Sequence, residues 1–351
     1  MHPLMHTGRP MAKVTLQSIA DRLGVSRMTV SNAFSRPDQL SADLRTRILA
    51  AADELGYVGP DPAARALARG RVGSVGLLLN GALSEAFEDQ VSAEFVASVA
   101  DELARRGLAM TVLTPPKGDD FVPARDVAID GALVYTCEPK SAGVEWLGRR
   151  SFPVVAVDQD LGKTVPGVRV DDRDGARKGA QHLLDLGHRR IGILALGSVD
   201  AKGKLVESQS YPARMRLAGW RAALKKAGVD AVVVRAPFEP RDAALTAAHE
   251  LLEHHSVTAV LCFSDVFAQA VVRAAEALGK RVPEDISVVG YDDSPLSSTH
   301  RPPLTTVRQD ITAKGRTAAG MLADLLDGRR ATSELLPVTL VVRESTAPVA
   351  R

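Results

Sequence analysis

Apolar residues in the first sixty positions recur at helical spacing in three short segments. The first segment follows Thr15, a good helix cap, and carries its apolar side chains on one face: Leu16, Ile19, Ala20 and Leu23. Gly24 permits a sharp turn, and Ser26 can cap a second segment whose apolar residues close a small core: Val25, Val30, Ala33 and Phe34. A third segment starts at Ser41 and ends at Gly56. The spacing predicts two helices joined by a turn and a third helix that supports them.

A shorter helical segment follows in the sequence GPDPAARALARG, residues 59–70. Asp61 is a good cap, Pro62 suits the first helical position, and Gly70 ends a helix of about two turns. A helix this short is unstable alone in water, so it needs a partner. Arg65 and Leu67 favour the minor groove of DNA, where proteins insert cationic side chains and apolar wedges. A plain interdomain linker is the alternative.

From residue 72 onward, short apolar runs alternate with longer amphipathic segments. The runs predict strands at 75–79, 110–113, 132–135, 154–158, 191–196, 232–235, 259–263 and 286–290. This rhythm is typical of an α/β fold with parallel sheets covered by helices. Two such sheets would form two lobes with a cleft, and ligands bind beyond the carboxyl ends of the strands. Four polar residues end or follow predicted strands and are site candidates: Asn80, Asp158, Asp265 and Asp292.

Charged residues are spread evenly along most of the chain, with a small excess of basic residues near the N-terminus. The 351 residues, 45% of them hydrophobic, exceed one ordinary domain, and the net charge is only +2. Residues 12–71 contain nine lysines and arginines against six acids. No apolar run is long enough to cross a bilayer, and residues 1–11 lack the apolar core of a signal peptide. We therefore expect a cytoplasmic protein with a disordered N-terminal arm, in which Cys137 and Cys262 are buried free thiols.

An enzyme is the main competing class, and the sequence argues against it. His254 and His255 are adjacent, so they do not share one helix face, and no set of His, Cys and carboxylates has metal-ligand spacing. The pair Asp171 and Asp172 could suggest acid–base chemistry, but no phosphate loop or nucleophile elbow accompanies it. We expect no catalytic residue, metal or cofactor. A periplasmic sugar-binding protein is a second competitor, disfavoured by the helical N-terminal segment and the missing signal peptide.

Motifs at both ends of the chain resemble the lac repressor family of bacterial transcription regulators, from about Val14 to Thr346. Near the N-terminus these are TLQSIADRLGVSRMTVSNAF, LSADLRTRILAAADELGY and PAARALA, and downstream RMRLAGW, ISVVGYDD, RPPLTTVRQD and LLPVTLVVRES. The resemblance implies a helix-turn-helix headpiece at 12–58, a hinge helix and linker at 59–71, and a periplasmic-binding-protein-like effector domain at 72–351. Its lobes would be about 72–170 plus 308–337 and about 171–307 plus 338–351.

The resemblance also implies a function. Family members bind a double-stranded DNA operator as homodimers and respond to a small-molecule effector, most often a sugar. We therefore expect a repressor released by a sugar, with a nucleoside or purine as the alternative effector and a corepressor as the alternative to an inducer. The implied DNA-contacting residues are Thr15, Ser26, Arg27, Met28, Thr29, Ser31, Asn32, Arg65 and Leu67.

The implied effector contacts are Asn80, Asp158, Arg216, Ser264 and Asp292. A carboxylate accepts from paired hydroxyls and an arginine fork donates in a plane, so Arg216 and Asp292 could grip a polyol ring. A surface ion pair is the alternative for Arg216, and for Asp265 we expect a helix cap rather than a ligand contact. Ser264 departs from the asparagine common in the family, and segment 197–214 is unusually long. This segment could be a lid acting through Tyr211 or a plain surface insertion.

Overall fold

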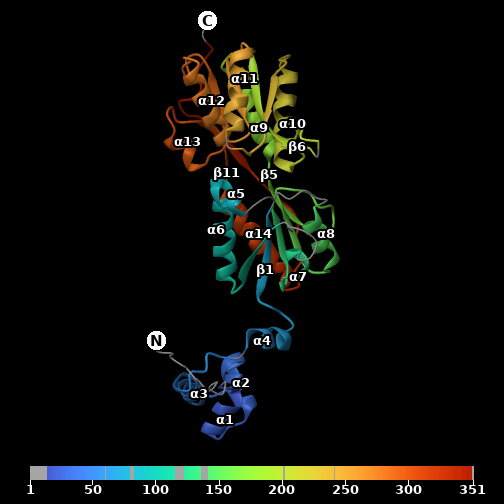
Figure 1. The fold of residues 1–351 in the computed structure, drawn as a ribbon, viewed down its shortest axis with the longest axis vertical. Coiled ribbons are helices and arrows are strands. Elements are labelled where there is room, and N and C mark those ends of the chain that lie inside the picture. Colours follow the sequence, from blue (N-terminus) through green and yellow to red (C-terminus); the bar gives the residue numbers. More distant parts are fainter. Residues whose placement is uncertain are drawn as a thin grey trace, which may run out of the picture. The chain divides into compact units, whose positions relative to one another are not determined.

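The computed structural model describes residues 14–59, 61–79, 83–114, 122–135, 141–200, 202–240 and 242–349. The chain divides into two compact units, Met1–Val72 and Gly73–Arg351, which we call the N-terminal and C-terminal units. Figure 1 labels the α-helices of both units and some of the strands of the C-terminal unit. Within the described residues, no helix is both long and apolar enough to traverse a lipid bilayer.

The N-terminal unit is helical over its described residues. Its elements are α1 (Leu16–Leu23), α2 (Arg27–Ser35), the 3₁₀ helix η1 (Pro37–Gln39), α3 (Ala42–Glu54) and α4 (Pro62–Arg69). The predicted caps are confirmed, because Oγ of Ser26 accepts from the backbone N–H of Thr29 at 3.0 Å and Thr15 forms a capping box with Ser18. Gly24 makes the turn with a φ of 65°, a conformation that glycine adopts without strain. The core takes one fully buried side chain from each of the first three helices: Ile19, Val30 and Ile48.

The first lobe of the C-terminal unit contains a parallel sheet. Its strands, in spatial order, are β12 (Glu334–Leu336), β5 (Gly167–Val170), β4 (Val154–Val157), β3 (Ala132–Tyr135), β1 (Ser74–Leu79) and β2 (Ala109–Leu113). The helices of this lobe are α5 (Leu83–Glu88), α6 (Gln90–Arg105), α7 (Pro123–Asp126), α8 (Ala142–Arg149) and α14 (Ile311–Leu326).

The second lobe contains a sheet that is parallel except at two strands. Its order is β13 (Val338–Val341), β11 (Thr305–Gln309), β10 (Ser287–Asp292), β9 (Ala259–Cys262), β6 (Ile191–Val199) and β7 (Leu205–Glu207), with β8 (Val232–Ala236) also paired to β6. The strands β7 and β13 run antiparallel to their neighbours. The helices of this lobe are α9 (Asp172–Asp185), α10 (Tyr211–Lys226), α11 (Ala243–His254), α12 (Asp265–Ala277) and α13 (Pro295–Thr299).

Both faces of each sheet are buried, which explains the continuous apolar runs in the sequence. In β1, Leu77 and Leu79 pack in the cluster formed with α6 and α14, whereas Leu78 packs in the opposite cluster. Because successive strand residues point to opposite faces, a strand covered on both sides must be apolar throughout. Each fully buried leucine contributes roughly 1.5–3 kcal/mol, so these cores dominate the stability of the unit.

The chain passes between the two sheets at three places: after Val170, after Gln309 and after Leu336. The second of these leads from β11 into α14, which packs against α6 and against strands of the first sheet. All eight predicted strands are present. The strands β5, β7, β11, β12 and β13 were not predicted, because polar residues interrupt their apolar runs: Arg169, Glu207, Arg308, Glu334 and Thr339.

Candidate functional site

Arg216 occupies the centre of a buried polar cluster in the second lobe. Its Nε donates to Oδ1 of Asp172 at 2.8 Å, and its Nη2 lies 3.1 Å from Oδ1 of Asp292. Its Nη1 donates to the backbone carbonyl of Phe263 at 2.6 Å. Burial opposes the charge, but the two carboxylates outweigh it and raise the pKa of Arg216. With its side chain only 5% exposed, Arg216 is not the surface ion pair that was the alternative.

Aromatic rings and a glycine hold this guanidinium in place. It lies 3.6 Å from the ring centroid of Tyr291 and 4.8 Å from that of Phe263, both within cation–π range. Gly219 lies one turn further along α10, where a Cβ atom would come within 2.3 Å of the backbone oxygen of Arg173. Because of this close approach, α10 packs directly on α9 and brings Arg216 to Asp172.

The carboxyl ends of β4 and β10 carry Asp158 and Asp292 in the left-handed region, with φ values of 53° and 104°. Such backbone angles are costly for residues other than glycine, and they recur at functional sites. Burial is the main cause that raises the pKa of Asp292. Both carboxylates are almost fully buried.

Asp265 is not the predicted helix cap. Ser264 caps α12, with its Oγ accepting from the backbone N–H of Phe267 at 3.4 Å. Asp265 instead accepts from the backbone N–H and hydroxyl of Ser294, at 2.8 and 3.0 Å, and from the hydroxyl of Thr306 at 2.6 Å. Burial, and then the neighbouring Asp292, raise the pKa of Asp265 to about 7. The sequence expectation failed because these partners come from distant segments.

Sequence reasoning missed Asp172, Gln309 and Lys314 as members of this cluster. Lys314 forms an ion pair with Asp158, and Gln309 donates to Oδ1 of Asp292 at 2.7 Å. Lys314 lies at helical spacing with buried apolar residues of α14, and a lysine on such a face was the available signal. The candidate Asn80 lies outside the described residues.

The long segment 197–214 begins as a β-hairpin of β6 and β7, in which Gly197 pairs with Glu207. Tyr211 starts α10, and its ring lies 5.2 Å from the guanidinium of Arg169 on β5. The segment is therefore partly ordered by strand pairing. A ligand contact through Tyr211 stays a prediction.

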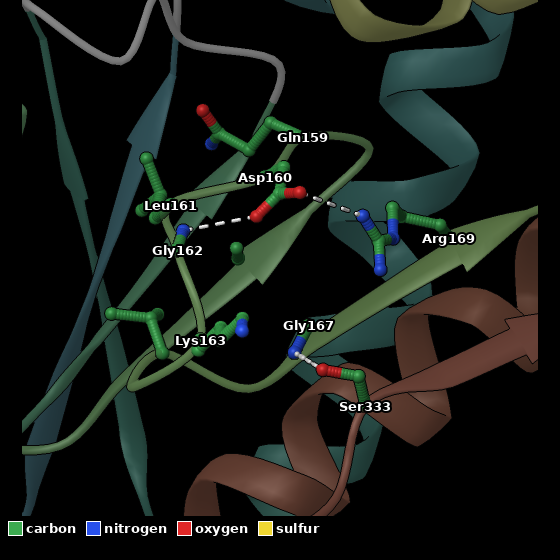
Figure 2. A pocket seen from close by; sticks show the side chains of 10 residues that line it. Gln159, Asp160, Leu161, Gly162, Lys163, Gly167, Arg169 and Ser333 are labelled. Atoms are coloured by element: carbon green, nitrogen blue, oxygen red, sulfur yellow. Dashed lines mark hydrogen bonds and ion pairs between the residues drawn. The ribbon is translucent and has the colours of Figure 1, made fainter.

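A separate small cavity of about 230 Å³ lies in the first lobe, beside the loop between β4 and β5 (Figure 2). Asp160 accepts from the backbone N–H of Gly162 at 2.9 Å and lies 3.6 Å from Nη1 of Arg169. Gly167 donates to the hydroxyl of Ser333 at 3.0 Å on the opposite wall. The cavity is lined by none of the residues around Arg216.

In the N-terminal unit, the outer face of α2 presents most of the candidate DNA contacts. Arg27 and Met28 are exposed, and Ser31 and Asn32 are partly exposed. The side chain of Asn32 donates through Nδ2 to Oε1 of Gln39 at 3.1 Å. On α4, Leu67 is 87% exposed. The roles of these residues stay predictions.

Some candidate DNA contacts also shape the local structure. The hydroxyl groups of Ser26 and Thr29 lie 2.8 Å apart at the start of α2, and Thr15 caps α1. Arg65 is exposed on α4. Among the described residues, no group of three or more His, Cys, Asp or Glu side chains is placed to hold a metal ion.

Comparison with known proteins identifies the family. Residues 15–59 match the model for bacterial regulatory proteins of the lacI family, and residues 180–346 match a periplasmic binding protein-like domain. The HTH-type transcriptional regulator IpsA of Corynebacterium glutamicum is 36% identical over 91% of this chain and 93% of its own length.

Two solved structures are also similar. The lac repressor dimer bound to operator and the anti-inducer ONPF has 28% identity and a TM-score of 0.80, over 96% of this chain and all of that one. The CelR–cellobiose complex has 30% identity and a TM-score of 0.69, over 95% of this chain and all of that one. With a helix-turn-helix unit, a two-lobed unit and relatives that match over nearly their whole length, this chain belongs to the lacI family of DNA-binding transcription regulators and is not an enzyme.

Proposed function

We propose that this regulator is a repressor that binds a near-palindromic operator as a homodimer and is released by a small-molecule effector, most simply a sugar. The effector would bind around Arg216, Asp292 and Asp158, with Ser264 and Asn80 as further contacts. A nucleoside or purine is the alternative effector, and a corepressor the alternative to an inducer.

The buried Arg216–Asp292 pair is the observation that carries the effector site. It lies at the carboxyl ends of the strands of the second sheet, where ligands bind in open α/β folds. Isolating a fixed guanidinium and several carboxylates from water is costly, and it is justified where a polar ligand must be held in one orientation. The similar CelR structure contains cellobiose, which favours a sugar here.

An aromatic group beside this pair fits a ring-shaped ligand. Phe238 follows β8 and is 51% exposed, and its ring packs edge-on against Phe263 at 5.8 Å. Phe263 in turn lies against the guanidinium of Arg216. A flat apolar face next to charged hydrogen-bonding groups suits the C–H face of a sugar ring and would also stack on a base, so both effector classes fit this feature.

Two exposed apolar side chains support DNA binding. Met28 is 70% exposed at the start of α2, the position from which helix-turn-helix proteins contact base edges. Leu67 is exposed on a helix of eight residues, which is too short to be stable without a partner. We infer that Leu67 enters the minor groove at the operator dyad, with Arg65 toward the phosphates.

Two measurements test the proposal. Selection from a random DNA pool should recover a symmetric motif, and thermal-shift screening of sugars and nucleosides should find a stabilising compound. A ligand at 100 times its Kd should stabilise the fold by about 2.7 kcal/mol. Fluorescence anisotropy with the selected operator then gives the sign of the effect: an inducer weakens operator binding and a corepressor strengthens it. Recovery of no symmetric motif would refute operator recognition.

A further inference from the structure

Lys314 is a lysine whose side chain is only 1% exposed, on the buried face of α14. Lysine is almost never fully buried unless its charge is paired, because removing an ammonium from water is costly. The apolar residues around it on α14, among them Ile311 and Ala318, belong to the core of the first lobe. A charged side chain at this position therefore needs a partner whose interaction offsets the cost of removing the charge from water.

The partners of Lys314 belong to both lobes. Its Nζ pairs with Oδ2 of Asp158, at the end of β4 in the first lobe, and donates to Oε1 of Gln309 at 2.9 Å. The Nε2 of Gln309 donates to Oδ1 of Asp292, at the end of β10 in the second lobe. We call this series, Asp158–Lys314–Gln309–Asp292, the interlobe relay. It continues through Arg216 to Asp172.

Close packing fixes the height of Lys314 above the first sheet. At the next residue, Gly315, a Cβ atom would come within 1.8 Å of Oγ of Ser98 and 3.1 Å of the backbone oxygen of Phe95. The helix α14 therefore lies directly against α6. The ring centroid of Tyr135 lies 5.9 Å from Nζ and limits its movement on the sheet side.

The relay leaves one specific acceptor unused. Lys314 occupies Oδ2 of Asp158, whereas Oδ1 of Asp158 is buried without a hydrogen-bond partner. An unsatisfied buried acceptor costs roughly 1–3 kcal/mol, which a hydrogen-bond donor from a ligand would recover. A hydroxyl group is such a donor. A phosphate or carboxylate group brings only acceptors. It would also meet three carboxylates, those of Asp158, Asp172 and Asp292, against only two cations, Lys314 and Arg216, so the net charge of the cluster repels an anion.

We propose that Lys314 is a positioning residue of the effector site: it holds Asp158 in register with Asp292 across the two lobes, and so selects neutral polyhydroxy ligands over phosphorylated ones. This inference rests on the proposed effector function. Arg216 does not reverse the selection, because its charge is already shared by Asp172 and Asp292.

The test uses the full-length protein and matched pairs of compounds. The matched neutral members are D-glucose, D-galactose and adenosine, and the anionic members are the phosphates of the same three; cellobiose is added as a neutral compound without a phosphate counterpart. Thermal unfolding is measured with each compound for the wild type, Lys314→Met, Lys314→Arg and the control Lys178→Met. Lys178 is a partly exposed lysine of α9 that pairs with Asp174. The double variant Asp158→Asn/Lys314→Met removes both charges and leaves none unpaired.

We expect at least one neutral compound to stabilise the wild type while its phosphate does not. Lys314→Met should weaken the binding of that compound by about tenfold or more, which corresponds to about 1.4 kcal/mol. Lys314→Arg should retain part of the wild-type affinity for that compound, and Lys178→Met should retain all of it. The double variant should regain thermal stability relative to Lys314→Met, because it leaves no buried charge at Asp158 without its counter-charge.

Three results would overturn the proposal: a wild-type response in Lys314→Met, stabilisation by a phosphate but not by its neutral counterpart, or no stabilisation by any neutral member. Operator binding without ligand, measured on the same preparations, separates these results from a failure of the regulator function. A wild-type protein that binds no selected operator refutes that function, whatever the compounds do.

Discussion

Nη2 of Arg216 lies 3.1 Å from Oδ1 of Asp292, and both side chains are almost fully removed from solvent. The pair joins α10 to the end of β10, and Asp172 on α9 completes it from the other side. Breaking a buried pair leaves an uncompensated charge and typically costs about 3–5 kcal/mol, whereas removing both charges can cost little. This cluster therefore contributes to stability and is also a candidate ligand site. Substitutions there must be chosen so that a loss of ligand binding can be distinguished from a loss of stability.

Asp292→Asn keeps the shape of the side chain and the acceptor for Gln309 while removing the charge. We expect it to abolish the effect of a screened effector on operator affinity, because a ligand shifts the DNA-binding population only through its binding energy. Ligand-free operator binding should stay near wild type. Anisotropy titrations measure both quantities.

The matched control is Arg221→Met, which removes a half-exposed arginine from the same helix as Arg216. It should change stability by no more than about 0.5 kcal/mol, as is typical at the surface, and keep the response. An Asp292→Asn protein that still responds like the wild type would place the effector elsewhere.

Gly219→Ala should lower the free energy of unfolding by about 1–3 kcal/mol, because the added methyl group meets the backbone of α9 rather than a movable side chain. The displacement of α10 should also weaken effector binding through Arg216. Gly148→Ala, on α8 with open space around it, is the control. It should be neutral or stabilising by up to about 1 kcal/mol. Chemical denaturation distinguishes the two, and equal effects would contradict the close packing.

Leu67→Ala should weaken binding to the selected operator by about tenfold or more, with little loss on random DNA. The reason is that a minor-groove wedge contributes only where the duplex is kinked and makes extra contacts. Val58→Ala, which shortens a fully exposed side chain outside α4, is the control. Equal losses on operator and random DNA would show that α4 is a tether.

Asn32 should specify an adenine in each half-site, since its amide can bond both N6 and N7 of that base. Asn32→Ala should relax the preference there by about 1–3 kcal/mol. Gln39→Ala should have a smaller effect in the same direction, because Gln39 orients the Asn32 amide through its Oε1. Repeating the selection with both variants checks this. An unchanged motif with Asn32→Ala would exclude Asn32 from base recognition.

The contribution of Asp265 to stability should fall as pH rises from about 4 to about 7, because burial raises its pKa to about 7 while the unfolded chain has a carboxyl pKa near 4. In this window the folded state binds more protons than the unfolded state, so a higher pH favours unfolding. Asp292, whose pKa is also raised, acts in the same direction. Asp265→Asn should flatten the profile of unfolding midpoint against pH. An unchanged slope would show that Asp265 is ionised throughout.

The sequence alone determined most of the local elements and the family. The caps at Thr15, Ser26 and Ser41 could be predicted because each hydroxyl accepts a hydrogen bond from the backbone N–H three residues later, within one short segment. The predicted strands could be recognised because burial on both faces demands continuous apolar residues. The motif around Arg216 marked this residue as a candidate before any contact was known.

Only the tertiary structure decided which residues interact with Asp265 and Lys314. Asp265 was expected to cap its own helix, yet it bonds Ser294 and Thr306, and Lys314 received no role although it pairs with Asp158, 156 positions away. Such contacts depend on how two sheets and their crossings are placed, and no local periodicity encodes that placement. A buried charge is stable only beside its counter-charge, so the identity of this cluster was settled by packing and not by the spacing of residues along the chain.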